Sequence, residues 1–221
     1  MVMTMLRNKH RPHDPVWHVQ LAMLFTIGLQ LLLPNIFSFG GRYVTPVLEL
    51  ILLGALSLTT PPERVFKSLV RRVNALLLIA ITSLTNTYAL AMVVQRLLAH
   101  SSITSGRTLI LASINIYLTN IVIFALWYWE MDGGGPGERQ RIEPYEQDFM
   151  FPQHINKDYK HPEWRPTFVD YLYVSSTNAM AFSPTDTLPL SRRAKMLMLL
   201  QAAISLITIA LVAARAVNIL N

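Results

Sequence analysis

Residues 168–190 read FVDYLYVSSTNAMAFSPTDTLPL, and residues 196–220 read MLMLLQAAISLITIALVAARAVNIL. The first stretch is aromatic and apolar for roughly half the thickness of a bilayer and then turns polar at Thr185 and Asp186. The second stretch is long enough to cross the bilayer completely. Together they predict a chain that dips into a membrane and turns within it. Non-helical backbone is tolerated at that depth only where protein or a water-filled cavity surrounds it.

The composition of the whole chain is that of a helical membrane protein. Of its 221 residues, 52% are apolar and 14% are charged, whereas about a quarter of the residues of a soluble domain are charged. A helix needs about 20 apolar residues to cross a bilayer. Five segments approach or reach this length: Trp17–Phe39, Tyr43–Leu58, Val73–Gln95, Thr108–Trp129 and Met196–Ala214. We therefore predict an all-α integral membrane protein, with a bundle of five transmembrane helices plus a re-entrant or half-spanning pore-loop-like helix at 168–183.

The chain divides into three parts. Residues 1–130 are a four-helix transmembrane region behind a cytoplasmic N-terminal tail, and residues 168–221 are the pore-loop-like hairpin with the last transmembrane helix. Between them, residues 131–167 are a Gly/Pro-rich charged loop. The run GGGPG at 133–137 follows no strand and carries no Lys-Ser or Lys-Thr pair, so we interpret it as a flexible linker rather than a phosphate loop.

The distribution of basic residues predicts the orientation. With five spans, fifteen of the nineteen Lys and Arg residues lie on the same side as the N-terminus. Because cytoplasmic loops carry the excess of Lys and Arg, we expect a cytoplasmic N-terminus. The C-terminus lies outside if 168–183 re-enters, and inside if it crosses. A net charge of +6 would suggest nucleic acid in a soluble protein, but here it suits anionic lipid. The expected partner is the lipid bilayer, with no nucleic acid.

The C-terminal region resembles the pore helix, selectivity filter and inner helix of small potassium channels. In that family an aromatic-rich pore helix leads into T-V-G-Y-G-D, then a nearby proline and a long apolar helix. Here residues 179–183, AMAFS, take the place of T-V-G-Y-G. Asp186 and Pro189 keep the D-x-x-P spacing, with Asp186 two residues late. Ala181 and Ser183 replace the filter glycines, whose backbone freedom turns carbonyls toward the ion. The resemblance therefore implies a shared architecture rather than potassium selectivity.

The chain as a whole is similar to a family of uncharacterised bacterial inner-membrane proteins. Their C-terminal pattern is DYLYVS-TNA-AFSPTD--PL, followed by an apolar helix that ends ARAVN. The pattern occurs here at Asp170–Ser175, Thr177–Ala179, Ala181–Asp186, Pro189–Leu190 and Ala214–Asn218. The resemblance implies a multi-pass protein of the bacterial inner membrane. It implies no activity, because none is assigned to the family.

The hairpin supplies the candidates for lining a pore or a solute site. They are Thr177, Asn178, Ala179, Met180, Ala181, Phe182, Ser183, Thr185 and Asp186. As an ion-channel-like protein, the chain would form a homo-oligomer that brings this segment to a shared axis, where Asp186 attracts a monovalent cation. As a small-solute transporter, the broken helix would line a site within one chain. As a non-conducting membrane scaffold, the segment would be a turn that joins two packed helices.

Three charged residues lie nearest the hydrocarbon, and they are Glu49, Asp170 and Arg215. Carboxylates inside a membrane mark proton or cation sites by default. Both acids lie within a turn or two of a segment end, so we interpret them as interfacial and hydrated. Arg215 either pairs with one of them or extends to the headgroups. The asparagines of the predicted spans are expected to hydrogen-bond between helices.

The sequence carries no signature of an enzyme, a metal site or a cofactor. There is no cysteine, which excludes disulfides and thiolate chemistry. The six histidines form no set with metal-ligand spacing. No nucleophile elbow, HExxH or paired-carboxylate pattern occurs. We therefore expect neither catalysis nor a cofactor.

Overall fold

The computed structural model describes residues 17–58, 69–98, 105–139, 142–156, 164–181 and 186–220. In this part of the chain the α-helices are α1 (Trp17–Leu32), α2 (Val44–Leu58), α3 (Leu69–Leu98), α4 (Gly106–Met131), α5 (Pro152–Ile155), α6 (Phe168–Ala181) and α7 (Arg192–Leu220). Short 3-10 helices are η1 (Asn35–Phe37), η2 (Asp132–Gly134) and η3 (Pro144–Glu146), and two strands are β1 (Phe149–Met150) and β2 (Leu188–Pro189). The all-α fold class is confirmed.

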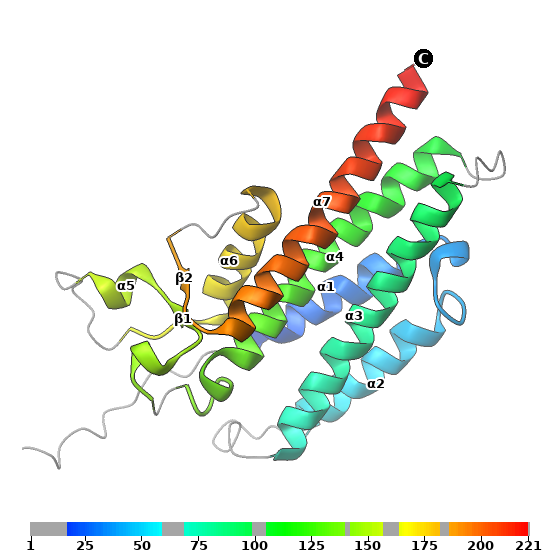
Figure 1. Cartoon of the computed structure of the whole chain (residues 1–221). Coiled ribbons are helices and arrows are strands. Elements are labelled where there is room, and N and C mark those ends of the chain that lie inside the picture. Colours follow the sequence, from blue (N-terminus) through cyan, green and yellow to red (C-terminus); the bar gives the residue numbers. More distant parts are fainter. Residues whose placement is uncertain are drawn as a thin grey trace, which may run out of the picture.

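Helix α4 is the central element. It packs against α7, α6, α3 and α1 (Figure 1). Every residue from 119 to 126 is buried, as expected for a helix that is apolar around its whole circumference. Its start is fixed by Ser105, whose Oγ accepts a hydrogen bond from the backbone N–H of Thr108 at 3.2 Å. The candidate functional groups described below are attached to this helix or to its neighbours.

Three helices are long and apolar enough to cross a membrane: α3, α4 together with η2, and α7. The other two predicted spans correspond to shorter apolar helices, α1 with 16 residues and α2 with 15. Helix α1 ends at Leu32, two residues before Pro34, because proline cannot continue a helix and disfavours helical backbone in the residue before it. Glycines at 40 and 41 adopt positive φ in the turn into α2.

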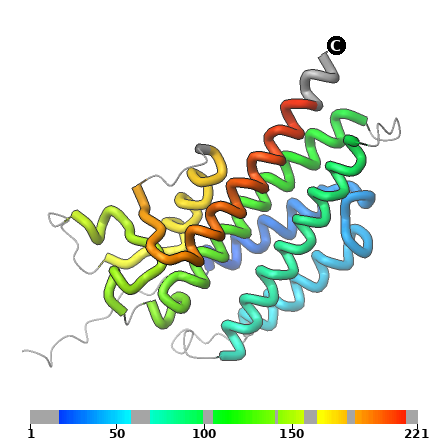
Figure 2. The backbone as a smooth tube through the Cα atoms, viewed as in Figure 1, coloured from blue at the N-terminus to red at the C-terminus, as the bar shows by residue number. Residues whose placement is uncertain are grey.

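A cap of short elements covers one end of the bundle. It comprises residues 132–139, 142–156, 164–167 and 186–191, and it lies beside the C-terminal end of α4 and the N-terminal end of α7 (Figures 1 and 2). Strands β1 and β2 pair antiparallel, with Phe149 opposite Pro189 and Met150 opposite Leu188. Phe149 and Phe151 are buried in the main hydrophobic cluster. The described parts of the Gly/Pro-rich charged loop at 131–167 are therefore folded onto the bundle.

Helix α6 begins at the cap end of the bundle. After α6, the chain returns to the same end. Phe168 packs edge-on against Trp129 near the end of α4. After α6, strand β2 pairs with β1, which follows that same end of α4. Fourteen helical residues extend about 21 Å, which is shorter than a span. Helix α7 then runs from the cap end to the opposite end, where the C-terminus lies (Figure 1).

Candidate functional site

Buried charges gather at the C-terminal end of α4. Asp132 is fully buried, and its Oδ1 accepts hydrogen bonds from the backbone N–H groups of Asp148, at 2.6 Å, and Phe149, at 3.2 Å. Its Oδ2 accepts a hydrogen bond from the hydroxyl of Tyr171. Asp132 thus joins α4, strand β1 and helix α6 through a single carboxylate.

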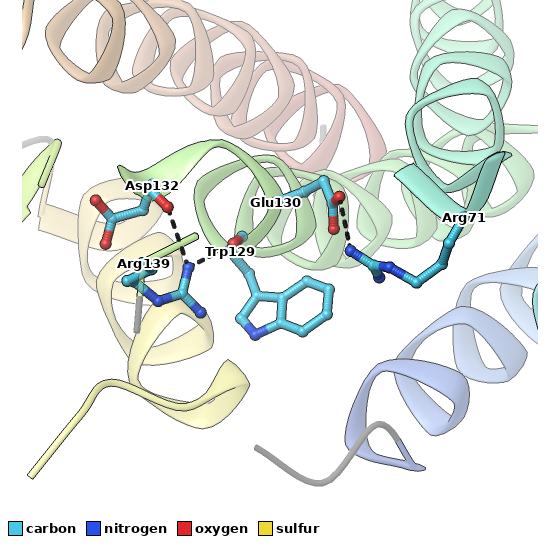
Figure 3. Close-up of polar contacts among 5 residues, drawn as sticks. All are labelled: Arg71, Trp129, Glu130, Asp132 and Arg139. Carbon is cyan, nitrogen blue, oxygen red and sulfur yellow. Dashed lines mark hydrogen bonds and ion pairs between the residues drawn. The ribbon is translucent and has the colours of Figure 1, made fainter. Parts of the chain in front are cut away.

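Arg139 caps the same end of α4 (Figure 3). Its Nη1 donates to the carbonyl of Trp129 at 2.8 Å and to that of Asp132 at 3.3 Å. The last carbonyls of a helix lack partners within it and carry the negative end of the helix dipole, so a guanidinium is well suited there. The Cζ atom lies 4.9 Å from the centroid of the Tyr171 ring, a cation–π distance.

The three consecutive glycines let the chain turn back sharply, so that Arg139 reaches the C-terminal end of α4. Gly133, Gly134 and Gly135 all have positive φ, at 57°, 83° and 102°. A Cβ added at Gly135 would lie 3.1 Å from the carbonyl oxygen of Glu130. The glycine run is therefore required by backbone conformation and by close approach to α4.

Glu130 and Arg71 form a buried ion pair on the other side of α4 (Figure 3). Arg71 Nη2 lies 3.2 Å from Glu130 Oε1. The pair contributes to the wall of a cavity of about 20 Å³, which is otherwise lined by apolar side chains of α1 to α4. Glu130 Oε2 has no hydrogen-bond partner among the described residues. The cavity has room for about one water molecule.

A polar network joins α4, α6 and α7 inside the bundle. The Tyr128 hydroxyl donates to Gln201 Oε1 at 2.5 Å, and Asn178 Nδ2 donates to the same oxygen at 2.9 Å. Gln201 Nε2 donates to the carbonyl of Ser175, at 2.9 Å, and to its Oγ, at 2.7 Å. All four side chains are buried, and none is left with an unpaired polar atom within the described chain. The network holds the α6 hairpin against the two long helices.

A second set of polar contacts continues along α7. Gln201, Ser205 and Thr208 recur at helical spacing on one buried face. Asn120 Nδ2 donates to Ser205 Oγ at 3.1 Å. Asparagines at 74, 86 and 115 each donate to a main-chain carbonyl of a neighbouring helix. For the asparagines at 74, 86, 115, 120 and 178, the expectation of interhelical hydrogen bonds is confirmed.

Glu49 is fully buried between α1, α2 and α3, rather than hydrated at an interface as the sequence suggested. Gln30 Nε2 donates to Oε1 at 2.9 Å and to Oε2 at 3.1 Å. Thr45 Oγ1 donates to Gln30 Oε1 at 3.3 Å. The sequence interpretation placed Glu49 at an interface because it lies near the start of α2. In the structure the longer helix α3 runs past the start of α2 and covers Glu49.

The other two charged candidates have different surroundings. Asp170 is half-buried, and its Oδ2 accepts from the backbone N–H of Thr167 at 2.7 Å and from the Thr167 hydroxyl at 2.9 Å. This contact caps the start of α6. Arg215 lies within α7, and its side chain is outside the described residues.

The pore-lining candidates of the hairpin are separated by the structure. Asn178 and Ala179 are buried against the bundle. Thr177 donates to carbonyls of its own helix, and Ala181 is the last residue of α6. Two candidates are exposed: Met180 and Asp186. Three lie outside the described residues: Phe182, Ser183 and Thr185.

Sequence reasoning missed the groups that organise the end of α4 and the face of α7. Glu130 and Asp132 end an apolar run directly after the Trp127–Trp129 aromatic residues, which was a usable signal. The helical spacing of Gln201 and Ser205 within an apolar span was another. Arg139 gave no signal beyond its charge. Among the described residues, no three His, Asp or Glu side chains gather as metal ligands would.

Comparison of the chain with models of protein families, with characterised proteins and with solved structures finds no match. The resemblances drawn from the hairpin sequence therefore remain predictions.

Proposed function

We propose that this protein is a non-conducting membrane scaffold, a closed helical bundle that carries a folded cap on its cytoplasmic side. The observation that carries the proposal is the network of Tyr128, Ser175, Asn178 and Gln201. A helix that lined a pore within this chain would turn such polar groups toward water. Here the polar groups form hydrogen bonds between helices, and these hydrogen bonds fix the hairpin in one position.

Several features support a membrane location. The three long apolar helices have the length that a bilayer requires. The outward side of α7 exposes large apolar side chains that lipid would cover: Met196, Leu199, Leu200, Leu206, Ile207 and Ile209. With α1 and α2 as the shorter pair, the bundle has five spans, and α6 is a re-entrant helix that enters from the cap side.

The charge distribution supports a cytoplasmic cap. Arg192, Arg193 and Lys195 are exposed at the start of α7, beside the cap. Arg71 and Arg72 begin α3 at the same end. By the positive-inside rule this end faces the cytoplasm, which places the N-terminus inside and the C-terminus outside, in a bacterial inner membrane.

The channel-like alternative needs several copies of the chain, with their hairpins meeting at one axis. Met180 and Asp186 are the hairpin candidates that are exposed in the described part and therefore free to reach such an axis. In that arrangement the carboxylate of Asp186 would attract cations, and removing its charge would reduce their flux.

The experiment compares the two functions directly. The full chain is purified in mild detergent, its mass is measured, and it is reconstituted into liposomes loaded with a fluorescent potassium indicator. The scaffold predicts the same cation flux as empty liposomes, for the native chain and for Asp186→Asn. An oligomer that conducts, and whose flux falls in Asp186→Asn, would replace the scaffold with the channel.

A further inference from the structure

Glu49 lies deep in the bundle, away from the groups that hold the hairpin. It is the sixth residue of α2 and has no exposed surface. Its partner Thr82 is the fourteenth of the 30 residues of α3, so the carboxyl lies near the middle of the longest helix. A carboxylate at this depth is costly unless a cation or several donors stabilise it.

The described neighbours of Glu49 provide no cation. Helices α1 and α3 pack against α2. On α1 the titratable group is His18, at the far end from Gln30. On α3, Arg71 pairs with Glu130, and Arg72, Tyr88 and Arg96 lie ten, six and fourteen residues from Thr82. Arg42, before α2, donates to the carbonyl of Leu31 at 2.8 Å. No ion pair forms at Glu49 within this part of the chain.

Burial without a neighbouring cation favours a protonated carboxyl at Glu49. Gln30 is the amide donor to both oxygens. The Thr82 hydroxyl is also a partner of Glu49, yet it donates its one proton to the carbonyl of Leu78 at 2.9 Å. The Thr82 oxygen therefore offers Glu49 a lone pair. A lone pair is matched by a carboxylic O–H and repelled by a carboxylate.

We propose that Glu49 is a proton-binding site inside the membrane, with Gln30 and Thr82 as the groups that orient its neutral carboxyl. The carboxyl O–H of Glu49 donates a hydrogen bond to Thr82 Oγ1, and the Thr82 hydroxyl donates one to the carbonyl of Leu78. Thr45 fixes the rotamer of Gln30 through its hydroxyl. This site goes beyond the scaffold function and does not depend on it.

The first test uses dicyclohexylcarbodiimide, an apolar reagent that attacks protonated carboxyls in apolar surroundings. The full chain in native membranes is treated at neutral pH, and the tryptic peptide Tyr43–Arg64 is sequenced by mass spectrometry to separate Glu49 from Glu63. We expect adduct at Glu49, lost in Glu49→Gln and unchanged in Glu146→Gln, which alters an exposed acid of the cap. Labelling should fall about tenfold per pH unit once the pH exceeds the pKa of the carboxyl.

Infrared spectroscopy covers the case in which the reagent cannot reach the site. A carbonyl band of a neutral carboxylic acid at neutral pH, absent from Glu49→Gln, supports the proposal. Equal spectra for the native chain and the folded variant would overturn it. Protection from the carbodiimide by sodium ions but not by potassium ions would also overturn it, because Glu49 would then be a ligand of a metal cation.

Discussion

Arg71 Nη2 lies 3.2 Å from Glu130 Oε1, and the two side chains are 6% and 0% exposed. The pair joins the first turn of α3 to the last turn of α4, across 59 residues of sequence. Two charges removed from water gain little net stability by pairing, yet either one alone is a large penalty. The contact therefore specifies how the two helices align more than it strengthens the bundle.

The difference between losing one charge and losing both predicts how a single and a double substitution affect stability. Glu130→Leu alone should reduce the free energy of unfolding by about 3–5 kcal/mol, because it removes the carboxylate that balances the charge of the buried Arg71 guanidinium. Arg71→Met combined with Glu130→Leu should restore most of that loss. Chemical unfolding of the purified chain in detergent measures both. Equal destabilisation by the single and double variants would mean that the charges act independently.

Gln201 should be the most sensitive residue on α7. Gln201→Leu removes the acceptor of the buried Tyr128 hydroxyl and one hydrogen bond each from Ser175 and Asn178, which keep their contacts to the carbonyls of Ile121 and Met198. Each group left unpaired costs roughly 1–3 kcal/mol, so a clear fall in the melting temperature is expected. Gln95→Leu is the matched control, since Gln95 is exposed on α3. If the two variants melt alike, the network does not hold the hairpin.

Two glycine substitutions should act in opposite directions. Gly135→Ala places a Cβ 3.1 Å from the carbonyl oxygen of Glu130 at a φ of 102°, and should destabilise the chain by roughly 1–3 kcal/mol. Gly28 lies within α1, and the Cβ that Gly28→Ala adds would have no neighbouring atom within 4 Å. It should be neutral or stabilising by up to about 1 kcal/mol. Melting curves of both variants test whether the glycine run is a structural turn.

The cap should lose stability in mild acid through His154. Burial, together with the nearby charge of Arg165, lowers the pKa of His154 in the folded chain. The unfolded chain therefore binds a proton first as the pH falls below about 6.5, and stability declines until the folded pKa is passed. Above that window His154 contributes no pH dependence. His154→Phe keeps an aromatic ring against Trp164, 5.0 Å away in the native chain, and should flatten the profile of protease resistance against pH.

Thiol labelling tests the orientation without interference, because the chain has no cysteine. Tyr145 is 70% exposed in the cap, and Arg107 is exposed in the first turn of α4, at the opposite end. In intact cells an impermeant maleimide should modify Arg107→Cys and leave Tyr145→Cys unmodified until the membrane is opened. The reverse pattern would place the cap outside.

Much of the helical layout could be predicted from apolar periodicity and length. The segment Thr108–Trp129 became α4, extended by two residues at each end, and the short apolar run after Thr167 became α6. Hydropathy bounded the second span at Tyr43–Leu58, close to the observed α2, but it extended the first span to Phe39, whereas α1 ends at Leu32, before Pro34.

The candidate site was less predictable because its contacts are distant in sequence. Asp132 and Tyr171 are separated by 39 residues, and no local pattern links them. The glycine run was interpreted as a linker because glycine is as common in flexible chain as in turns of positive φ. The contact of Arg139 with the end of α4 distinguishes a structural turn from a flexible linker. That contact depends on where α4 ends.

The network between α4 and α7 has a consequence for how the protein is made. Asn120 and Tyr128 find their partners 85 and 73 residues later in the chain, at Ser205 and Gln201. The central helix is therefore synthesised and delivered to the membrane while its polar groups still lack their final contacts. A chain that stops before α7 would therefore leave unpaired in its central helix the polar groups that the finished chain buries.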